Sequence, residues 1–394
     1  MKKYFITIFI FMPILIFSQT KNGAYRVQML FPVAYDINNL TIRGFSGSVK
    51  SDLSNLSSAN PALISDFDKI SGSLSFSYPS TNTTFLYGDI GLGKYKPYIP
   101  NNFTILFPFN SFQIAGAYNQ RFFSSLDFGN IQVTTENQPD GTGETYSPDF
   151  YTLVNEYSII LGSSTFEVGD DDKLSFGLNF NLNHLIIYEK IFRSQMKFEQ
   201  IRPSFSIGIN YVFNEKYRVN FFYSHRVKFS GTSKFEGPDL LRLEGNPRGG
   251  QNYKIDSPDL QIIENIPSSF SLGILITETE FLNYYFQYSR EFWNTAYVYF
   301  SDSHNYSSGV SYRVSDGFIF STGINYLYQK QDPNEIFDGN LSALYLNFGS
   351  IFYFDQFNFS AVLADSHISN SISSDITSYR RKQTLFKLAI GYAF

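Results

Sequence analysis

The stretch LFKLAIGYAF, residues 385–394, alternates between two kinds of side chain along its whole length. The residues of one face are large and apolar: Phe386, Leu388, Ile390, Tyr392 and Phe394. The residues of the other face are small or charged: Lys387, Ala389, Gly391 and Ala393. An alternation with a period of two is typical of a β-strand with one apolar face. We therefore expect a strand here.

The same alternation recurs throughout the chain. Apolar and polar residues take turns over residues 70–78, 174–183, 204–211 and 269–276. The polar face is mostly Ser, Asn and Gly, whereas the solvated surface of a soluble sandwich would carry more charge. Small uncharged side chains suit a lumen packed with protein. The pattern predicts an all-β transmembrane antiparallel barrel.

Composition supports this prediction. Aromatic residues make up 19% of the 394 residues, yet the mean hydropathy is only −0.16, which does not fit a helical membrane protein. The net charge of −5 supplies no basic field for nucleic acid. The absence of Cys excludes disulfides, thiol catalysis and a Cys-linked lipid anchor. The four His residues are scattered and form no ligand cluster.

Both ends of the chain predict export to the outer membrane of a Gram-negative bacterium. Lys2 and Lys3 precede an apolar run over residues 5–17, so residues 1–19 read as a signal peptide, although Ile16 makes its cleavage box poor. A final strand that stops on Phe394 resembles the signal that the outer-membrane assembly machinery reads. That machinery and the outer-membrane lipids are therefore expected partners.

Connections between the alternating segments are short and long in turn, as in a barrel whose two ends face different compartments. Residues 67–394 are expected to form the barrel, with about fourteen strands. The expected strands are 69–79, 98–108, 112–123, 150–167, 173–190, 196–213, 217–231, 266–277, 281–292, 304–314, 317–329, 341–354, 356–366 and 383–394. Residues 20–66 alternate weakly and precede the first strand. A barrel this wide needs a plug if it is not to leak, so they are predicted to form an N-terminal plug, or hatch, in the lumen.

Short motifs carry a resemblance to a known family. Asn60-Pro61-Ala62 stands between the predicted plug and the first strand, and a Pro-then-Leu-Gly strand start follows at residues 266–273. With Phe292-Trp293-Asn294 and Tyr392-Ala393-Phe394, the chain resembles the long-chain fatty acid transporter FadL family. The run before the triplet is poorer in acidic residues than the family pattern. The resemblance implies a channel for hydrophobic compounds such as fatty acids, released sideways into the membrane.

Two groups of candidate residues follow from this resemblance. Asn60, Pro61 and Ala62 would form a hatch constriction that moves on ligand binding, or else a turn into the first strand. Gly116, Tyr118, Asn119 and Arg121 interrupt the alternation of the third strand. They would mark a lateral opening, since the family's third strand is kinked and Gly inside a strand often marks a bend. The alternative is that they form the rim end of that strand.

Charged residues on predicted lumen faces are a third candidate group: Glu156, Arg202, Arg226, Lys228 and Arg313. Each of the four cations is a possible lumen ligand contact, because a cation in a partly apolar lumen can hold a fatty acid carboxylate. The alternative is that these residues pair with one another or with the plug, as buried charges generally must.

No enzyme activity is expected, because no nucleophile, phosphate loop or carboxylate pair stands out. The acidic stretch 169–172 reads as a solvated turn with too few oxygens for Ca²⁺, so no metal and no cofactor is expected. The predicted function is a monomeric outer-membrane channel for hydrophobic compounds. One alternative is a non-transporting barrel subunit of an outer-membrane secretion or assembly complex. A purely structural or adhesive surface barrel is a third reading.

Overall fold

The computed structural model describes residues 53–84, 101–127, 131–132, 145–146, 149–168, 171–191, 194–233, 260–296, 301–328, 342–367 and 380–394. The expected signal peptide, 1–19, and the first part of the expected plug, 20–52, lie outside the described residues.

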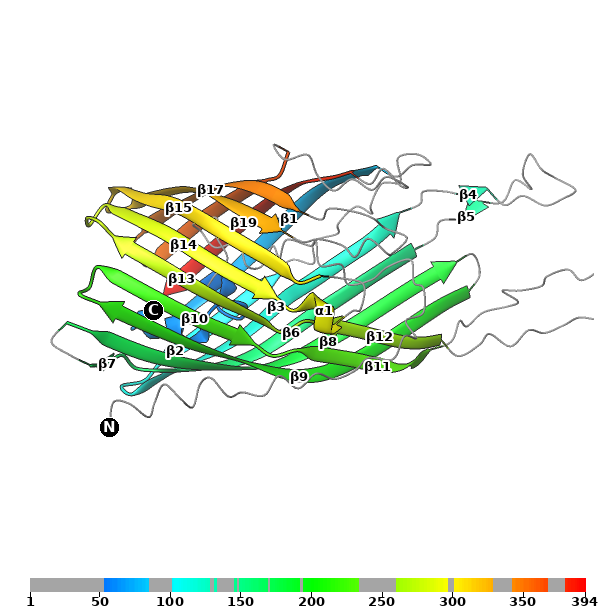
Figure 1. Ribbon diagram of the computed structural model, residues 1–394, viewed down its shortest axis with the longest axis horizontal. Helices are drawn as coiled ribbons and strands as arrows, with labels where there is room; N and C mark the ends of the chain where they lie inside the picture. The colour runs from blue at the N-terminus through cyan, green and yellow to red at the C-terminus, as the bar shows by residue number, and fades with distance from the viewer. Residues whose placement is uncertain are drawn as a thin grey trace, which may run out of the picture.

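Fourteen antiparallel strands close into a barrel whose strands are strongly tilted (Figure 1). In spatial order they are β1 (Ser71–Thr84), β2 (Asn102–Pro108), β3 (Phe112–Asp127), β6 (Asp149–Ser163), β8 (Lys173–Ile191), β9 (Ser194–Phe213), β10 (Tyr217–Ser224), β13 (Ser269–Thr277), β14 (Leu282–Glu291), β15 (Ser303–Ser315), β16 (Phe318–Tyr328), β17 (Ala343–Phe354), β18 (Phe357–Asp365) and β19 (Arg380–Ala393). Each predicted strand has its counterpart in this wall. The fourteen-strand prediction is confirmed.

The last strand closes the barrel against the first. β19 pairs with β1 from Ser71↔Ala393 to Thr84↔Arg380, so neither strand presents an unpaired edge along this seam. Phe386, Leu388 and Ile390 are exposed on the outer face, whereas Lys387 is 3% exposed on the inner face. The predicted facing of this strand is therefore confirmed.

The same division holds around the wall. Outward positions carry exposed Phe, Tyr, Leu and Ile, for example Ile159, Phe180 and Phe286, which form the lipid-facing belt of a transmembrane barrel. Inward positions carry buried Ser and Asn, such as Ser158 and Asn181. Among the described residues, no helix is long and apolar enough to cross a membrane.

Smaller elements depart from the prediction. The predicted strand 217–231 is interrupted at His225–Arg226, and its outer part, β11 (Val227–Ser233), pairs only with β12 (Leu260–Ile266). The short pair β4 (Ile131–Gln132) and β5 (Thr145–Tyr146) lies within an expected loop. β7 (Phe166–Glu167) is added to the edge of β8, and the helix α1 (Trp293–Ala296) follows β14.

Candidate functional site

The described part of the hatch, residues 53–66, lies inside the barrel near the end that carries the short turns (Figure 1). It contains two 3-10 helices, η2 (Leu53–Asn55) and η3 (Pro61–Asp66). η3 begins with the predicted triplet. Asn60 is its N-cap, and Pro61 occupies its first turn, where the missing N–H group leaves no hydrogen bond unmade.

Asn60 joins this helix to the wall. Its Oδ1 accepts a hydrogen bond from the Ala62 N–H group at 3.0 Å. Its Nδ2 donates to the carbonyl oxygens of Ile209 at 3.1 Å and Phe221 at 3.2 Å, on the neighbouring strands β9 and β10. The side chain is fully buried. One amide therefore satisfies the start of the helix and fastens it to two strands.

Three wall glycines form the seat for the triplet. Gly162, Gly177 and Gly208 stand side by side on β6, β8 and β9, because Gly177 pairs with both of the others. A Cβ atom at Gly162 would collide with Ile64, one at Gly177 with the Pro61–Ala62 peptide, and one at Gly208 with the Asn60 amide. Only glycine lets the hatch backbone approach the wall this closely. We call these three residues the glycine seat.

Polar contacts fix the hatch on other strands as well. Asn179 Nδ2 donates to Ser57 O at 2.8 Å, and Lys387 Nζ donates to Ser54 O at 3.1 Å. At the far end of η3, Arg218 of β10 forms an ion pair with Asp66 at 2.6 Å. Apolar contacts complete the seat through a cluster made of Leu53, Leu56, Ile64, Leu106, Ala115, Ala117 and Ile160.

The third strand has a bulge, but not at Gly116. Gly116 pairs regularly with Ile105 of β2 and Ile159 of β6, so no bulge lies at this glycine. Tyr118 and Asn119 also lie in regular register, and Tyr118 donates to Asn155 Oδ1 at 3.1 Å. The register shifts between Gln120 and Phe122, so Arg121 is the extra residue of the bulge. The strand continues to Asp127, so these residues are not its rim end either.

The pairing between β1, β2 and β3 stops at the level of this bulge. β2 starts at Asn102, and β1 pairs with it only through Ser71–Ser75. The last bonds across this region run from Asn101 N to Ser75 O at 3.1 Å and from Gln120 N to Asn101 O at 2.8 Å. Farther out, residues 121–127 of β3 pair with β6 alone, and residues 76–84 of β1 pair with β19 alone, among the described strands. We call this interval the β1–β3 interruption.

The predicted lumen charges fall into different surroundings. Glu156 is 2% exposed and accepts a hydrogen bond from Arg121 at 2.9 Å. Arg226 donates to Thr295 O and to Asn265 Oδ1, both at 2.7 Å. Arg313 is exposed near the end of β15 that leads into a short turn. These residues are not gathered into one site.

Lys228 is a correction. Its neighbours Val227 and Phe229 are buried against inward-facing side chains, and Lys228 itself is exposed on the opposite face of β11. The prediction that it faces the lumen is wrong, because the break at His225–Arg226 reverses which positions point inward.

Arg202 remains as a lumen cation. Its Nε is buried without a hydrogen-bond partner among the described residues. On β9 it stands between Phe198, which is buried in an apolar cluster, and the buried Ser204 and Ser206. A guanidinium at a boundary between apolar and polar surfaces suits an amphiphile with an anionic head group.

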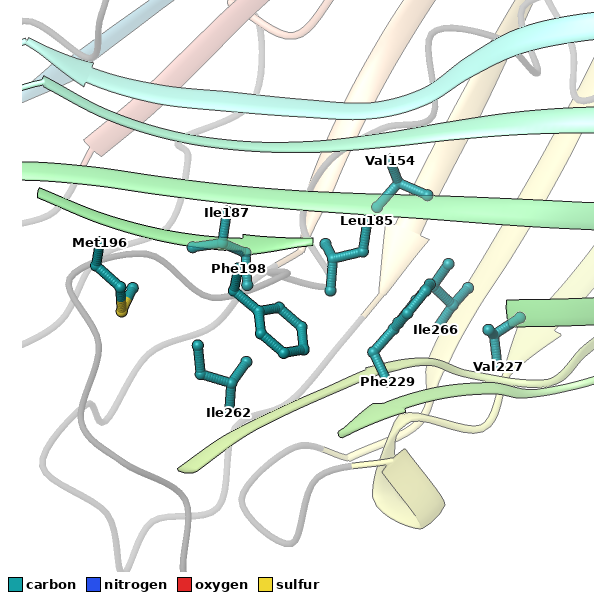
Figure 2. Close-up of a cluster of buried hydrophobic side chains, with 9 residues drawn as sticks. All are labelled: Val154, Leu185, Ile187, Met196, Phe198, Val227, Phe229, Ile262 and Ile266. Atoms are coloured by element: carbon teal, nitrogen blue, oxygen red, sulfur yellow. The ribbon is translucent and has the colours of Figure 1, made fainter. Parts of the chain in front are cut away.

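That apolar cluster lies toward the end of the barrel opposite the short turns, which we call the outer end. It consists of Val154, Leu185, Ile187, Met196, Phe198, Val227, Phe229, Ile262 and Ile266. Figure 2 shows side chains of β8 and β9 pointing toward those of β11 and β12. Phe122, just beyond the bulge of β3, packs against the same group. We call it the outer cluster.

A polar belt separates the outer cluster from the hatch. Along β6 the inward residues Glu156 and Ser158 lie between Val154 and Ile160. Along β8, Asn179, Asn181 and Asn183 lie between Leu185 and the glycine seat. The lumen is therefore apolar at the outer end, polar in the middle and apolar again around the hatch.

The belt holds no evident catalytic or metal constellation. Within the ranges that the structure describes, no group of three or more His, Cys, Asp or Glu side chains could hold a metal ion.

Sequence reasoning missed the glycine seat and the outer cluster. Gly177 and Gly208 stood in the quoted alternating runs, but only as small residues of a polar face. Their function depends on which strands lie side by side and in which register. A signal was present, since Gly162, Gly177 and Gly208 all occupy inward positions of successive strands.

Comparison with known proteins shows similarity in structure only. No family model matches the chain, and no curated protein matches it. The toluene transporter TodX of Pseudomonas putida superimposes with a TM-score of 0.61 at 12% identity, over 91% of this chain and 98% of that one. The toluene transporter TbuX of Ralstonia pickettii gives 0.59 at 11% identity, over 89% and 96%.

A FadL homologue of Pseudomonas aeruginosa gives a TM-score of 0.57 at 14% identity, over 88% of this chain and 95% of that one. These similarities extend over nearly the whole length of each chain. The resemblance read from the Asn60-Pro61-Ala62 junction is thus confirmed for the fold: the chain forms a fourteen-strand barrel with the fold of these solved structures.

Proposed function

We propose that this protein is an outer-membrane channel that admits hydrophobic compounds and releases them sideways into the membrane. The fold is that of solved toluene transporters and of a FadL homologue. The exposed apolar belt of the wall supports placement in a membrane.

One observation carries the proposed route: the outer cluster reaches Phe122, and Phe122 lies at the β1–β3 interruption. An apolar compound held by Phe198 and Phe229 is therefore in continuous apolar contact with the edge of a wall strand that has no described partner on its β2 side. Burial of an alkyl chain in this cluster contributes about 0.8 kcal/mol per CH₂ group.

The polar belt and the hatch oppose passage straight through the barrel. A hydrocarbon that descends past Glu156 and Asn181 leaves apolar surroundings and separates polar groups from their partners. It would then have to move a segment fastened by Asn60, Lys387 and Arg218 to three strands, β9, β10 and β19. Lateral exit above the belt avoids both barriers, and Asn60, Pro61 and Ala62 then act as an anchor.

A long-chain fatty acid is the substrate that fits Arg202. Its chain would occupy the outer cluster, and its carboxylate would meet the guanidinium at the upper edge of the belt. A neutral aromatic hydrocarbon needs no such partner, so Arg202 distinguishes the two substrate classes.

The test compares cells that lack the gene with cells that express wild type or Phe122→Gln. Uptake of radiolabelled oleate and toluene is normalised to the amount of folded barrel. Uptake should fall in the deletion strain, return with wild type, and stay low with Phe122→Gln. Unchanged uptake of both compounds in the deletion strain would rule out the proposal.

A second candidate is a non-transporting subunit of a secretion or assembly complex. The polar belt favours it, because a lumen sealed by polar groups does not need to conduct. Purification in mild detergent distinguishes the two: co-purification of stoichiometric outer-membrane subunits supports the second candidate, and an isolated barrel supports the channel.

A further inference from the structure

The strands β11 and β12 form a two-stranded arm that is separate from the wall. The last wall pair below it is Ser224↔Ser269, and the first pair of the arm is Val227↔Ile266. The breaks at His225–Arg226 and Pro267–Ser268 therefore lie opposite each other. No ladder hydrogen bond joins the two strands to each other at this level. Each break is bonded to its other neighbour, His225 N to Phe205 O and Phe292 N to Ser268 O, both at 2.9 Å. These bonds lie on the line that joins the two breaks, which we call the hinge line.

The β9 edge of the arm is held by side chains. The ladder between β9 and β10 ends at Ser206↔Ser224. Farther out, Gln200 Nε2 donates to Ser230 O at 3.0 Å, and Ser230 N donates to Gln200 Oε1 at 2.9 Å. The Gln200 amide thus occupies the place of a backbone peptide. A rotation of one side chain can break this pair, whereas a backbone ladder opens only if a strand moves.

The opposite edge is fastened at the base of the arm. Arg226 Nη1 donates to Thr295 O at 2.7 Å, and Asn265 Nδ2 donates to Ala296 O at 3.0 Å. Both residues adjoin the hinge line, and their acceptors belong to α1, which lies beside β12 (Figure 1). Contacts this close to an axis move little when the arm turns.

The apolar side chains on the inner face of the arm are part of the outer cluster. Phe229 and Ile262 are fully buried against side chains of β8 and β9 (Figure 2). A Cβ atom at Gly231 would lie 2.9 Å from Phe198 Cε2, so the ring packs directly on the arm backbone. A hydrophobic compound that enters between Phe198 and Phe229 displaces the arm, and it then replaces the apolar contacts that the arm loses.

We propose that the β11–β12 arm is a hinged lid over the outer cluster, with Gln200 as its latch. It turns about His225–Arg226 and Pro267–Ser268, and an apolar compound slides between Phe198 and Phe229. The identity of the compound rests on the proposed function, whereas the opening motion does not.

The chain contains no Cys, so a single introduced thiol reports accessibility. Ile262→Cys places a thiol under the lid. Leu106→Cys places one in the apolar cluster that packs around the hatch. Both positions are fully buried. N-ethylmaleimide labels each folded full-length variant in detergent. Adding Gln200→Ala should speed labelling of Ile262→Cys about tenfold and leave Leu106→Cys unchanged.

Equal rates with and without Gln200→Ala would overturn the lid, as would a similar rise at Leu106→Cys, which indicates general loosening. If Ile262→Cys does not fold, Phe229→Cys replaces it, and heat-modifiable mobility on SDS gels verifies folding. Gly231→Ala, whose new methyl group would crowd Phe198 Cε2 at 2.9 Å, should speed labelling as well.

The probe N-phenyl-1-naphthylamine distinguishes failure of the lid proposal from failure of the channel proposal. In the Gln200→Ala background, binding of this apolar dye should slow labelling of Ile262→Cys. If Gln200→Ala speeds labelling of Ile262→Cys but the dye does not slow it, the lid proposal stands and the route for hydrophobic compounds is contradicted. Slow labelling in both backgrounds, with oleate uptake intact, overturns the lid and leaves the channel.

Discussion

Lys387 in the last strand and Ser54 in the hatch are joined by a hydrogen bond of 3.1 Å from Nζ to the carbonyl oxygen, across 333 positions of sequence. The ammonium group is 3% exposed inside the barrel. A buried cation requires partners of this kind, so the closing strand both seals the wall and fastens the hatch.

Lys387→Met should loosen the hatch without opening the wall. Loss of this bond is expected to destabilise the seated segment by about 1–3 kcal/mol. The expected readout is greater sensitivity of cells to vancomycin, which is too large and polar for an obstructed barrel. Lys216→Met is the control, because Lys216 is exposed and its partner Glu278 lies 3.5 Å away. Equal sensitivity in both variants would contradict the anchor.

Gly177→Ala should unseat the hatch, because the new methyl group meets the Pro61–Ala62 peptide, which cannot rotate away. Overpacking of this kind costs about 1–3 kcal/mol. Gly116→Ala is the matched control in a neighbouring part of the wall, where a Cβ would only touch Ile105 Cγ2 at 3.9 Å. The midpoint of urea unfolding should fall for Gly177→Ala alone. A fall of the same size in both variants would mean that the methyl group merely disturbs a strand.

Asn60→Asp keeps the size of the side chain but replaces the donor with an acceptor. The new oxygen would face the carbonyls of Ile209 and Phe221 in a fully buried position. The expected loss is about 2–5 kcal/mol of unfolding free energy. Asn110→Asp, at an exposed turn, should change it by less than about 0.5 kcal/mol. Wild-type stability of Asn60→Asp would refute the docking role of the amide.

Arg202→Gln should separate substrate classes. Binding of oleate to the purified barrel in nanodiscs should weaken about 10- to 100-fold, since a hydrogen bond to a charged group is lost. Binding of toluene should stay unchanged. Lys228→Gln, on the outer face of β11, should alter neither. If oleate binds Arg202→Gln as tightly as wild type, the carboxylate lies elsewhere.

Phe394→Ser should impair assembly, because the exposed ring ends the closing strand and stacks edge-on with Tyr392 at 4.7 Å. The amount of heat-modifiable barrel in outer-membrane fractions should fall, while unfolded chain accumulates. Phe354→Ser, at an exposed turn of the same barrel end, is the control. Normal assembly of Phe394→Ser would remove the C-terminal ring from the recognition signal.

The wall could be predicted from sequence because the alternation within each strand identifies its apolar and polar faces. Alternation along residues 385–394 is a local property, and it survives in the structure with Lys387 inward and Phe386 outward. The hatch seat could not be predicted in this way. Its glycines act only once β6, β8 and β9 lie in register, which depends on pairings between distant segments.

Lys228 shows how a local reading fails. The alternation over 217–231 predicts one strand, and no Gly or Pro within residues 217–230 marks the break. The signal lay on the partner strand, where Pro267 cannot donate a ladder bond. A Pro on one strand therefore changes the facing of residues on its neighbour.

The many-stranded attachment of the hatch has a consequence for the order of assembly. Asn60 precedes every wall strand in the chain, yet its acceptors lie 149 and 161 positions later. Ser54 accepts its hydrogen bond from Lys387, which lies 333 positions later. Contacts this distant form late, since the loop between them must first be ordered. We therefore expect residues 53–66 to be made before the wall and docked after it, so that their docking reports that the cylinder is complete.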